Sequence, residues 1–547
     1  MNLDEVQKWA LAEGIPESVV ICFRDAALLT AISRLLQAAY REQYGTRSSL
    51  ERDISGQWFL VIGRAGELRM PVKRPFWHQR FEAAGFPEII DEAGDWHRVT
   101  TRDAFVEALQ SAWREDGRIP FDRLTADFDN SFANLVLNQL LFHVRPLNSA
   151  MEPAFDGHNS YPFPALRIGP TLQQIVSCSN LSDQPVDLPL AILNGYSFVS
   201  TEHGDDERFF RTWSGSAAGH WQPGMVALHP WQLALSPVLH SARRTGMLQV
   251  LPYCLSAMPL ASQRTCRILT TGYDVKLPVD ATLTGERRLL YGMNTLNAPV
   301  VSTLVRILRA ADGPDTLEFQ YDEASFTVPD EHAGRHLAAI IRRPPPESPG
   351  AVLVPALLLW AGQRLADSLL RIGDKDSAIE VFLAYCRILF RGPVEFYARW
   401  GLAFEPHLQN ALIRIEDGWP TGIVLRDLDG TILDPVRVPG LLRKHGLRLP
   451  VESWGSMPDS LSGARRLMHG LVYAHLSQVV LHLVEHADLD IETLENSIDQ
   501  IWRELSRETY SQLPRRVAEL RAESWTVKEL LRTRMDRSMV LSFRNGG

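Results

Sequence analysis

The sequence has few cysteines and no paired cysteine motif. Among its 547 residues the cysteines are Cys22, Cys178, Cys254, Cys266 and Cys386. An odd number of widely spaced cysteines argues against a disulfide framework and against a cysteine zinc site. We therefore expect a protein of the reducing cytoplasm.

A basic excess and long hydrophobic runs are also missing. The formal charge of −9 disfavours nucleic acid as the main partner, although a local basic cluster can still bind an anionic small molecule. The longest strongly apolar run, residues 351–362, is interrupted by Pro355 and is shorter than the roughly 20 residues of a membrane-spanning helix. The N-terminus lacks the basic and apolar regions of a signal peptide. No membrane partner is therefore expected.

The chain has the composition of a large globular protein without repeats. Hydrophobic residues make up 45% and charged residues 22%, which excludes a disordered chain, a collagen and a coiled coil. Lysine is scarce, with six lysines among the 56 basic residues, so a lysine inside a motif is more informative than usual.

Proline marks the main break in the chain. Residues 342–350 contain three consecutive prolines and a Pro-Gly pair, which can continue neither a helix nor a central strand. Before residue 150 the pattern is mostly helical, at 25–40 and 105–113, with a strand-like run at 58–63. The section 151–340 has short β-type runs, such as 249–252. Helical pattern returns at 351–400 and 460–540, around a predicted hairpin of residues 411–415 and 422–426. The predicted class is α+β.

Two segments carry charged groups suited to phosphate and carboxylate chemistry. Ser262, Arg264 and Thr265 are followed by Lys276 and by residues 284–288. Arginine forks, a lysine point charge and hydroxyl donors suit polyphosphate and carboxylate ligands. The alternative is an ordinary charged surface.

The second segment has two carboxylates on either side of the predicted hairpin. Glu405, His407, Gln409 and Asn410 precede it, and Asp427 follows it. If the hairpin closes, Glu405 and Asp427 meet and can hold Mg²⁺, which prefers oxygen ligands. The alternative is a helix end with a satisfied histidine.

Two further segments say little alone. Residues 229–232, His-Pro-Trp-Gln, suggest a rigid structural corner rather than catalysis. Residues 156–169 form a polar loop that includes His158 and Arg167.

Together the segments resemble the siderophore synthetases that work without a nonribosomal peptide synthetase, the aerobactin synthetase or IucA/IucC-like family. That family carries Gly-His-Pro-x-His-Pro-x-x-Lys-x-Arg-x-Gly, His-Pro-Trp-Gln, Ser-x-Arg-Thr with a downstream Lys and Thr-x-x-x-Arg, Glu-x-His-x-Gln-Asn, and Arg-Asp-x-x-Gly. Each motif is weak alone, but the set in this order is specific. The matching segments here are 157–169, 229–232, 262–265 with Lys276 and 284–288, 405–410 and 426–430.

The resemblance implies ATP-dependent adenylation of a polycarboxylate, often citrate, followed by attack of an amine or alcohol. It implies a three-part cupped-hand fold, commonly dimeric, with a thumb-like domain at 1–150, a fingers-like domain at 151–345 and a palm-like domain at 346–547. ATP and Mg²⁺ are the implied cofactors. The catalytic residues implied are His407, Arg288 and Lys276.

The remaining implied roles follow the motifs. Phosphate or nucleotide contacts come from Ser262, Arg264, Thr265, Lys276, Arg288, His407, Gln409, His158 and Arg167. Substrate contacts come from Thr284, Arg288, His407, Gln409 and Asn410. The implied Mg²⁺ ligands are Glu405 and Asp427.

The first motif departs from the family pattern. Asn159 replaces a proline, Tyr161 replaces the second histidine and Ala165 replaces the lysine. Losing a cation and a histidine on one loop weakens ATP binding or changes the acid substrate. Pro406 is a smaller departure, at a position where a small residue is usual.

Three other functions fit parts of the sequence. Residues 424–434 resemble the first motif of haloacid-dehalogenase-type phosphatases, with Asp427 as nucleophile and Asp429 as general acid, but no later partner motif for the metal follows. His475, His482 and His486 with Glu485 suggest a metal site, although a packed helix explains them better, as it does His332 and His336. A binding module, or a degenerate member, that captures a polycarboxylate or siderophore needs the same cationic cleft without the ATP-binding residues.

Overall fold

The computed structural model describes most of the chain. The described residues are 1–45, 47–63, 67–73, 80–113, 119–144, 157–158, 160–181, 184–194, 199–200, 206–220, 222, 224–347, 349–360, 365–450, 461–508, 514–522, 526–536 and 543–545. Mixed helix and sheet confirm the predicted α+β class.

The N-terminal part combines helices with a small sheet. Its helices are α1 (Leu3–Ala12), α2 (Glu17–Glu42), α3 (Arg102–Ala112) and α4 (Phe121–Val144). An antiparallel meander is formed by β1 (Ser48–Arg52), β2 (Trp58–Ile62), β3 (Leu68–Val72), β4 (Glu88–Ile90) and β5 (Trp96–Arg98). The sequence predicted α2, α3 and β2. The prediction of a mostly helical part missed the other strands, which are short and partly exposed.

The middle part is built on an antiparallel sheet that runs β8-β16-β17-β12-β11-β10-β7-β9. These strands are β7 (Val186–Leu193), β8 (Val199–Ser200), β9 (Met225–Ala227), β10 (Leu248–Pro259), β11 (Thr265–Ile268), β12 (Asp274–Lys276), β16 (Asp322–Thr327) and β17 (Ala338–Arg342). A smaller sheet holds β6 (Arg167–Ile168), β13 (Thr282–Leu283) and β14 (Glu286–Arg287). The helices are α5 (Leu172–Ser177), α6 (Asp206–Ser214), α7 (Pro230–Leu235), α8 (Pro237–Arg244), α9 (Gly292–Asp312) and α10 (Glu331–Gly334).

The C-terminal part wraps long helices around a second sheet, whose strands run β15-β21-β20-β18. They are β15 (Leu317–Phe319), β18 (Val352–Pro355), β20 (Ala411–Glu416) and β21 (Trp419–Leu425). Strands β20 and β21 form the predicted hairpin, whose turn residues Asp417 and Gly418 both have positive φ, as a type I′ turn requires. The short strands β19 (Leu402–Ala403) and β22 (Ile432–Leu433) pair, as do β23 (Thr526–Lys528) and β24 (Phe543–Asn545).

Helices of very different lengths pack around this sheet. They are α11 (Ala356–Trp360), α12 (Ala366–Leu369), α13 (Lys375–Trp400), α14 (Val438–Lys444), α15 (Ser462–Met468), α16 (Ser477–His486), α17 (Ile491–Glu508), α18 (Pro514–Ala522) and α19 (Leu530–Met535). Residues His469–Leu476 join α15 to α16 as a π-helical segment. Among the described residues, one helical stretch, Ser462–His486, is long and apolar enough to span a membrane, but 89% of its apolar window is buried in the protein.

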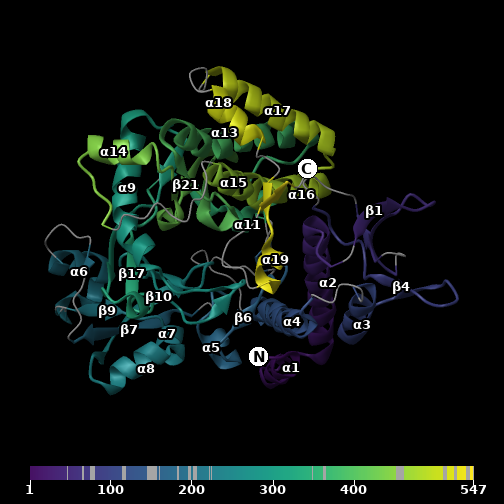
Figure 1. Ribbon diagram of the computed structural model, residues 1–547, viewed down its shortest axis with the longest axis horizontal. Helices are drawn as coiled ribbons and strands as arrows, with labels where there is room; N and C mark the ends of the chain where they lie inside the picture. Colours follow the sequence, from purple (N-terminus) through teal and green to yellow (C-terminus); the bar gives the residue numbers. More distant parts are fainter. Residues whose placement is uncertain are drawn as a thin grey trace.

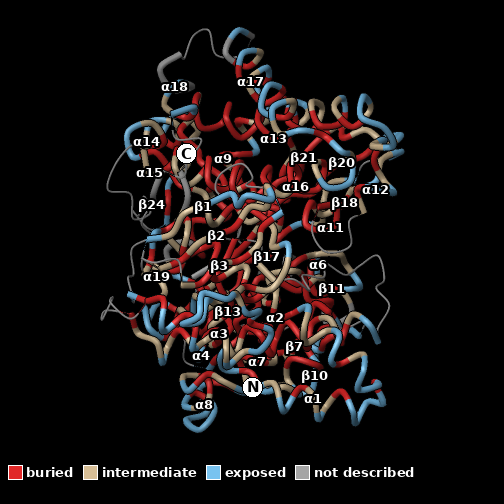
Figure 2. Tube along the Cα trace, turned by 90° about the vertical axis from the view of Figure 1, so that its right-hand side faces the viewer, coloured by how far each residue is buried: buried red, intermediate tan, exposed pale blue. Residues whose placement is uncertain are grey.

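Of three hydrophobic cores among the described residues, the two larger lie on either side of the middle of the molecule. One joins α1–α4, the first sheet and a face of the middle sheet, and the other joins α9, β15, the hairpin and the C-terminal helices. Figure 1 shows the C-terminal helices above the teal middle sheet, with the N-terminal helices beside them, and Figure 2 shows buried residues in both halves. Strand β15 pairs in parallel with β21, so residues 292–319 pack with the part that follows the prolines. The three-domain division stays a prediction.

Candidate active site

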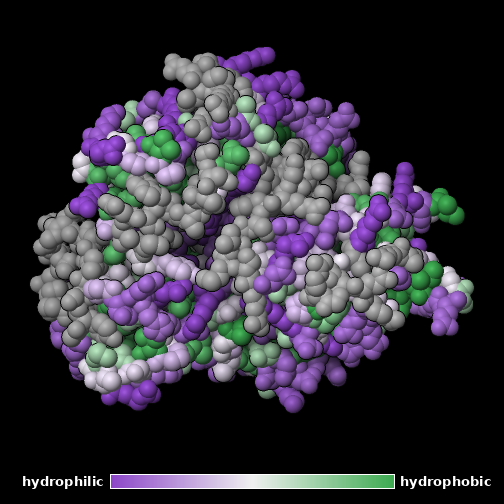
Figure 3. Space-filling view, viewed as in Figure 1, coloured by the Kyte–Doolittle hydropathy of each residue, from purple (hydrophilic) through white to green (hydrophobic). Residues whose placement is uncertain are grey.

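A cavity of about 350 Å³ lies where the ends of these sheets meet. Its walls come from residues 157–158, 164–167, 261–264, 276, 283–284, 286–291, 405, 407–410, 427 and 429–430, together with Leu357 and Arg466. Of the predicted site residues, only Thr265 is not on these walls. Figure 3 shows hydrophilic atoms in a recess near the centre of one face. The structure therefore brings together segments between residues 157 and 466, which spacing alone could not establish.

The turn between β10 and β11 carries Ser262 and Arg264. Ser262 Oγ donates to Thr265 Oγ1 at 2.9 Å and accepts the Thr265 N–H at 3.2 Å, so Thr265 lies behind Ser262. Gln263 has φ +64°, and its carbonyl lies 3.2 Å from Nε2 of the buried His229. His229 also accepts the Trp231 N–H at the start of α7. It therefore supports the turn, as the predicted structural corner requires.

Lys276 ends β12 and points at the loop after β21. Its Nζ lies 2.8 Å from Asp427 Oδ1 and 2.7 Å from Asp429 Oδ1. Arg342, at the end of β17, donates to Asp427 and to Asp322, both at 2.8 Å. Burial alone raises the pKa of Asp427, but the ammonium and the guanidinium hold it well below its usual range. Asp427 therefore carries its charge in the cavity.

Arg288 is held by a strained turn. Thr284 has φ +49°, which is rare for a β-branched residue, and its hydroxyl accepts from Arg288 Nη2. Arg288 Nε donates to the Leu283 carbonyl at 3.0 Å. Arg264 donates to the Leu289 carbonyl at 3.1 Å, and burial followed by the nearby Arg288 lowers the pKa of its guanidinium. Two guanidiniums are thus fixed side by side before any ligand arrives.

Three residues of the cavity wall are non-glycine residues in the left-handed region: Gln263, Thr284 and Asp427. Such backbone conformations cost on the order of 1–3 kcal/mol each and cluster at functional sites. Their concentration around one cavity is a second, independent sign that this is the functional site.

The Glu405–His407 loop is fixed from both sides. Glu405 forms ion pairs with Lys528 Nζ at 2.6 Å and Arg466 Nε at 2.8 Å. Although burial raises it, these cations hold the pKa of Glu405 well below its usual range. The Pro406 carbonyl lies 2.7 Å from Nδ1 of the buried His475.

Two cavity histidines are neutral. Burial lowers the pKa of His407 to about 4 and that of His158 to about 3. Their ring centroids are 6.4 Å apart. Because His158 Nδ1 accepts the Ser160 N–H at 3.2 Å, its neutral ring carries the hydrogen on Nε2. Both neutral imidazoles can therefore donate one hydrogen bond and accept another at neutral pH.

Arg167 is a buried cation whose described hydrogen-bond partners are neutral. Its Nη1 donates to the side-chain oxygens of Asn134 at 2.9 Å and Asn138 at 2.8 Å, both on α4. Burial lowers the pKa of its guanidinium to about 10, so it is charged at neutral pH. No carboxylate among the described residues forms an ion pair with it, which leaves its charge to attract an anion.

The charges on the cavity wall favour an anionic ligand. Six cations line it, against the four carboxylates of Glu286, Glu405, Asp427 and Asp429. The cations are Arg167, Arg264, Lys276, Arg287, Arg288 and Arg466. A chain with a net charge of −9 thus has a positive cavity.

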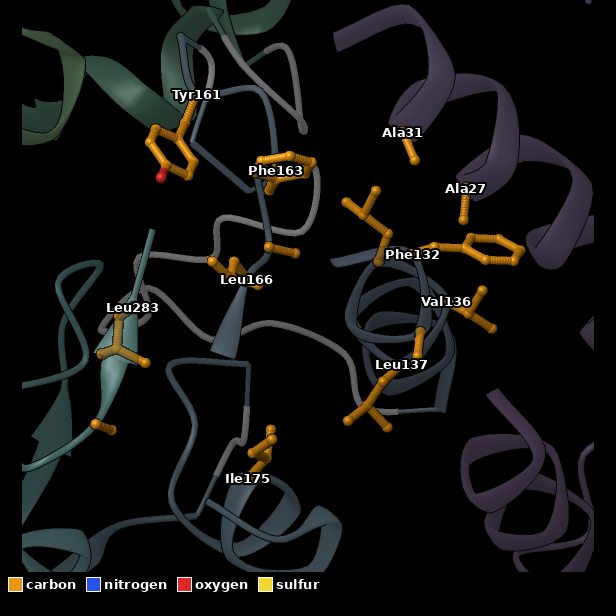
Figure 4. Close-up of a cluster of buried hydrophobic side chains, with 14 of the residues drawn as sticks. Ala27, Ala31, Phe132, Val136, Leu137, Tyr161, Phe163, Leu166, Ile175 and Leu283 are labelled. Atoms are coloured by element: carbon orange, nitrogen blue, oxygen red, sulfur yellow. The ribbon is translucent and has the colours of Figure 1, made fainter. Parts of the chain in front are cut away.

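In the altered first loop, Tyr161, which replaces the second histidine of the family motif, is buried in the hydrophobic core. Tyr161 is 6% exposed, and Figure 4 shows it grouped with Phe163, Leu166 and Leu283. A Cβ on Gly285 would lie 1.8 Å from the Tyr161 hydroxyl. Ala165 stays on the cavity wall, and Asn159 lies outside the described residues. Tyr161 therefore does not replace the function of a cavity histidine, while Ala165 leaves space without charge.

The carboxylates have the oxygen donors that Mg²⁺ prefers, but they are not free. Glu405 already binds two cations, Asp427 binds two and Asp429 binds Lys276. No group of three His, Cys, Asp or Glu side chains suited to a metal occurs in the described part of the chain. Because a metal must displace a lysine or arginine, the residues fit as donors but do not form a ready metal site.

The other histidine clusters have structural partners. His475 Nε2 lies 2.7 Å from the Tyr385 hydroxyl, and His482 Nε2 lies 2.7 Å from Asp367. His336 Nδ1 lies 2.9 Å from the Ser236 hydroxyl. These contacts support the packed-helix interpretation.

Sequence reasoning missed Arg342, Arg466 and Lys528. Arg342 and Arg466 belong to no motif, and arginine is abundant in this chain. Lys528 is one of only six lysines, so the scarcity of lysine was a signal for it.

The fold and the cavity define a protein that binds polyanionic small molecules between two α+β parts. Profiles of two families match the chain: "IucA / IucC family" at residues 148–359 and "Ferric iron reductase FhuF-like transporter" at residues 380–539. The first covers the walls formed by 157–291, so over these residues the chain is similar to the IucA / IucC family.

Similar proteins agree with this match. The staphyloferrin A synthase of Staphylococcus aureus is 22% identical, over 70% of this chain and 68% of its own. The D-ornithine–citrate ligase of the same organism is 21% identical, over 64% of this chain and 59% of its own. The names of these two relatives, a synthase and a ligase, describe bond-forming enzymes.

Solved structures share the whole fold. The petrobactin biosynthesis protein AsbB of Bacillus anthracis matches with a TM-score of 0.79 and 14% identity, over 99% of this chain and 98% of its own. ATP-bound aerobactin synthetase IucA of Klebsiella pneumoniae matches with a TM-score of 0.75 and 16% identity, over 94% of this chain and 99% of its own. At these identities the likeness concerns the fold.

Proposed function

We propose that the protein is an ATP-dependent siderophore synthetase. It adenylates a citrate-like polycarboxylate, joins the acyl group to an amine or alcohol, and releases pyrophosphate and AMP. The observation that carries this proposal is the positive cavity, which gathers the residues of four separated motifs on one wall. The names of the two staphylococcal relatives and the ATP-bound IucA support the same chemistry.

In the first step an oxygen of the substrate carboxylate attacks the α-phosphorus of ATP. The new P–O bond forms as the bond to the pyrophosphate oxygen breaks. Ser262, Arg264 and Lys276 bind the phosphates, and Arg288 neutralises charge between the α-phosphate and the carboxylate. Donors that are already oriented stabilise the developing charge without reorganisation. Thr265 acts indirectly, because it holds Ser262.

In the second step the nucleophile attacks the carbonyl carbon of the acyl-adenylate. The C–O bond to AMP breaks, and the attacking nitrogen or oxygen loses a proton. His407 is neutral and can accept that proton. Arg167 and His158 bind phosphate or carboxylate oxygens, and Thr284, Gln409 and Asn410 border the substrate.

Magnesium is proposed to accompany ATP. Glu405 and Asp427 are the proposed ligands, after exchange of one cationic partner each. Bound Mg²⁺ would neutralise phosphate charge. We also propose a homodimer in the cytoplasm without nucleic-acid or membrane partners, which size-exclusion chromatography with light scattering and cell fractionation test.

The proposal is tested by pyrophosphate release with ATP, Mg²⁺ and hydroxylamine. Citrate, 2-oxoglutarate, succinate and a citryl monoamide form the acid panel. Release that depends on one acid supports the proposal. Arg288→Ala and His407→Ala should each lower it by about 10²-fold or more, whereas Arg244→Ala, on the exposed surface of α8, should not. Near-full activity of both site variants would refute the assignment.

The alternatives give different results. A phosphatase releases phosphate from a generic phosphoester. For the synthetase we expect Asp427→Ala to lower activity more than Asp429→Ala does. The reverse order would favour the phosphatase. Asp427 also follows a strand paired with an antiparallel hairpin partner, and Lys276 binds both aspartates. A binding module or degenerate member binds the acid without releasing pyrophosphate.

A further inference from the structure

A short C-terminal segment, residues 526–536, connects the cavity to the other parts of the protein. Its cavity end is Lys528, the last residue of β23. The ammonium lies 2.6 Å from Glu405 Oε1, and its side chain is 13% exposed. The Lys528 backbone N–H donates to His469 Nδ1 at 3.2 Å, in the π-helical segment. Both contacts fix Lys528 against the part of the protein that carries His407.

The next residues anchor this segment in the N-terminal core. Leu531 and Met535 of α19 are buried among the residues of that core. The carboxylate of Glu42, at the end of α2, accepts the N–H groups of Leu531 at 3.0 Å and Arg532 at 2.7 Å. A charged acceptor thus satisfies first-turn donors of α19, which otherwise lack helical partners.

A third anchor reaches the strained turn of the cavity. Arg534 forms two hydrogen bonds with Asp127 of α4, at 2.8 and 2.9 Å. Its Nη1 also lies 3.5 Å from the Gly285 carbonyl, next to Thr284. Figure 1 shows α19 extending from the C-terminal part to α4 and β6. Residues 528–534 therefore contact the C-terminal part, the N-terminal helices α2 and α4, and the strained turn of the cavity.

We propose that Lys528 is a positioning residue for the synthetase reaction. Anchoring of α19 on α2 and α4 places its ammonium on Glu405, and this ion pair fixes the orientation of the Glu405–His407 loop. Arg466 holds the same carboxylate from α15, so loss of Lys528 leaves Glu405 paired but free to change rotamer. The inference rests on the proposed function, because its effect is on adenylation.

The geometry explains why a lysine from the chain end affects chemistry. Glu405 and His407 are two residues apart, and the Glu405 carbonyl accepts the His407 N–H at 2.9 Å. A change in the loop therefore moves the imidazole relative to the reacting phosphate. Misplacement by about 1 Å can cost up to about 10²-fold in rate.

The test compares Lys528→Met, Lys528→Arg and Arg534→Met with a matched lysine control. Lys375→Met is that control, because Lys375 is exposed and pairs only with the exposed Asp488 among the described residues. Acid-dependent pyrophosphate release gives kcat and KM, and thermal unfolding by circular dichroism confirms folding. We expect kcat to fall about tenfold or more in Lys528→Met, with KM for ATP within about threefold. Lys528→Arg should restore most of kcat, and Lys375→Met should match the parent protein.

Arg534→Met removes the ion pair with Asp127 that anchors α19, and leaves the Lys528–Glu405 contact itself unchanged in sequence. It should lower kcat in the same direction, and adding it to Lys528→Met should cause little further loss, because both changes act through one contact. Parent-like kcat in folded Lys528→Met overturns the inference while leaving the proposed function intact. Multiplicative losses in the double variant overturn it too. If the parent protein releases no pyrophosphate with any acid, the proposed function fails and this inference falls with it.

Discussion

Arg342→Met should destabilise the protein more than any single surface change, because Arg342 connects two sheets by charge. It ends β17 in the middle sheet and is 2% exposed. It binds Asp322, which is fully buried, and Asp427, which follows β21 of the C-terminal sheet. Methionine keeps much of the side-chain volume but removes both ion pairs.

The magnitude follows from the unpaired carboxylate. Removing one partner of a buried ion pair costs about 3–5 kcal/mol of unfolding free energy. For a folding unit of roughly 200 residues, 3 kcal/mol lowers Tm on the order of 5–10 °C. Asp427 keeps Lys276, so most of the cost should come from Asp322.

The loss should depend on pH. Burial raises the pKa of Asp322 to about 6 in spite of Arg342, so its native value lies above the unfolded value. The native state therefore binds more protons than the unfolded state between about pH 4 and pH 6, and its stability falls as the pH rises through this window. Without Arg342 the carboxyl keeps its proton to a higher pH. The destabilisation should be larger at pH 8 than at pH 5.

Urea and thermal unfolding of the parent, Arg342→Met and Arg342→Met/Asp322→Asn proteins measure this effect. The double variant should recover at least half of the loss, since a neutral amide replaces the unpaired charge. A single variant within about 1 kcal/mol of the parent, or a double variant no more stable than the single one, would show that this pair does not hold the sheets together.

Three other changes test separate features. Burial lowers the pKa of His229 to about 4, so the unfolded state takes up a proton at a higher pH than the native state does. The free energy of unfolding should therefore fall by about 3 kcal/mol from pH 6.5 to 4. In urea titrations, His229→Gln should flatten this pH dependence. Thr284→Gly removes backbone strain and the hydroxyl that holds Arg288, so Tm should stay or rise while adenylation falls on the order of tenfold; a fall in Tm would contradict this. Gly285→Ala should cost about 2 kcal/mol or more, and Tyr161→Phe should recover part of it, measured by thermal unfolding.

The sequence predicted local features that depend on neighbouring residues. The helix at 25–40, the strand at 58–63 and the hairpin around Asp417 are set by periodicity and by turn residues, and the structure confirms them. The proline-rich stretch lies between β17 of the middle sheet and β18 of the C-terminal sheet. It does not separate two cores, because Leu317–Phe319 adds a parallel strand to the later sheet. Periodicity gives no information on which distant strand a short strand joins.

The candidate site was predictable where motifs carry it and not where single cations complete it. Four motif segments meet on the cavity wall as the resemblance implied. The motifs misled in one detail, since Thr265 supports Ser262 from behind. The roles of Arg342 and Lys528 arise from ion pairs across 85 and 123 positions, and only the scarcity of lysine marked Lys528 in the sequence.

Internal ion pairs explain how a positive cavity persists in an acidic protein without substrate. Each carboxylate on its wall is bound to a cation: Glu286 to Arg288, Glu405 to Arg466 and Lys528, and Asp427 and Asp429 to Lys276. Unpaired cations at this density would repel one another and move apart, whereas paired ones keep fixed positions. Phosphate and carboxylate oxygens therefore meet donors that are already oriented, and little reorganisation remains for the reaction itself. The same carboxylates neutralise part of the positive charge on the cavity wall. The remaining excess comes from cations that pair with no carboxylate of the wall, such as Arg167.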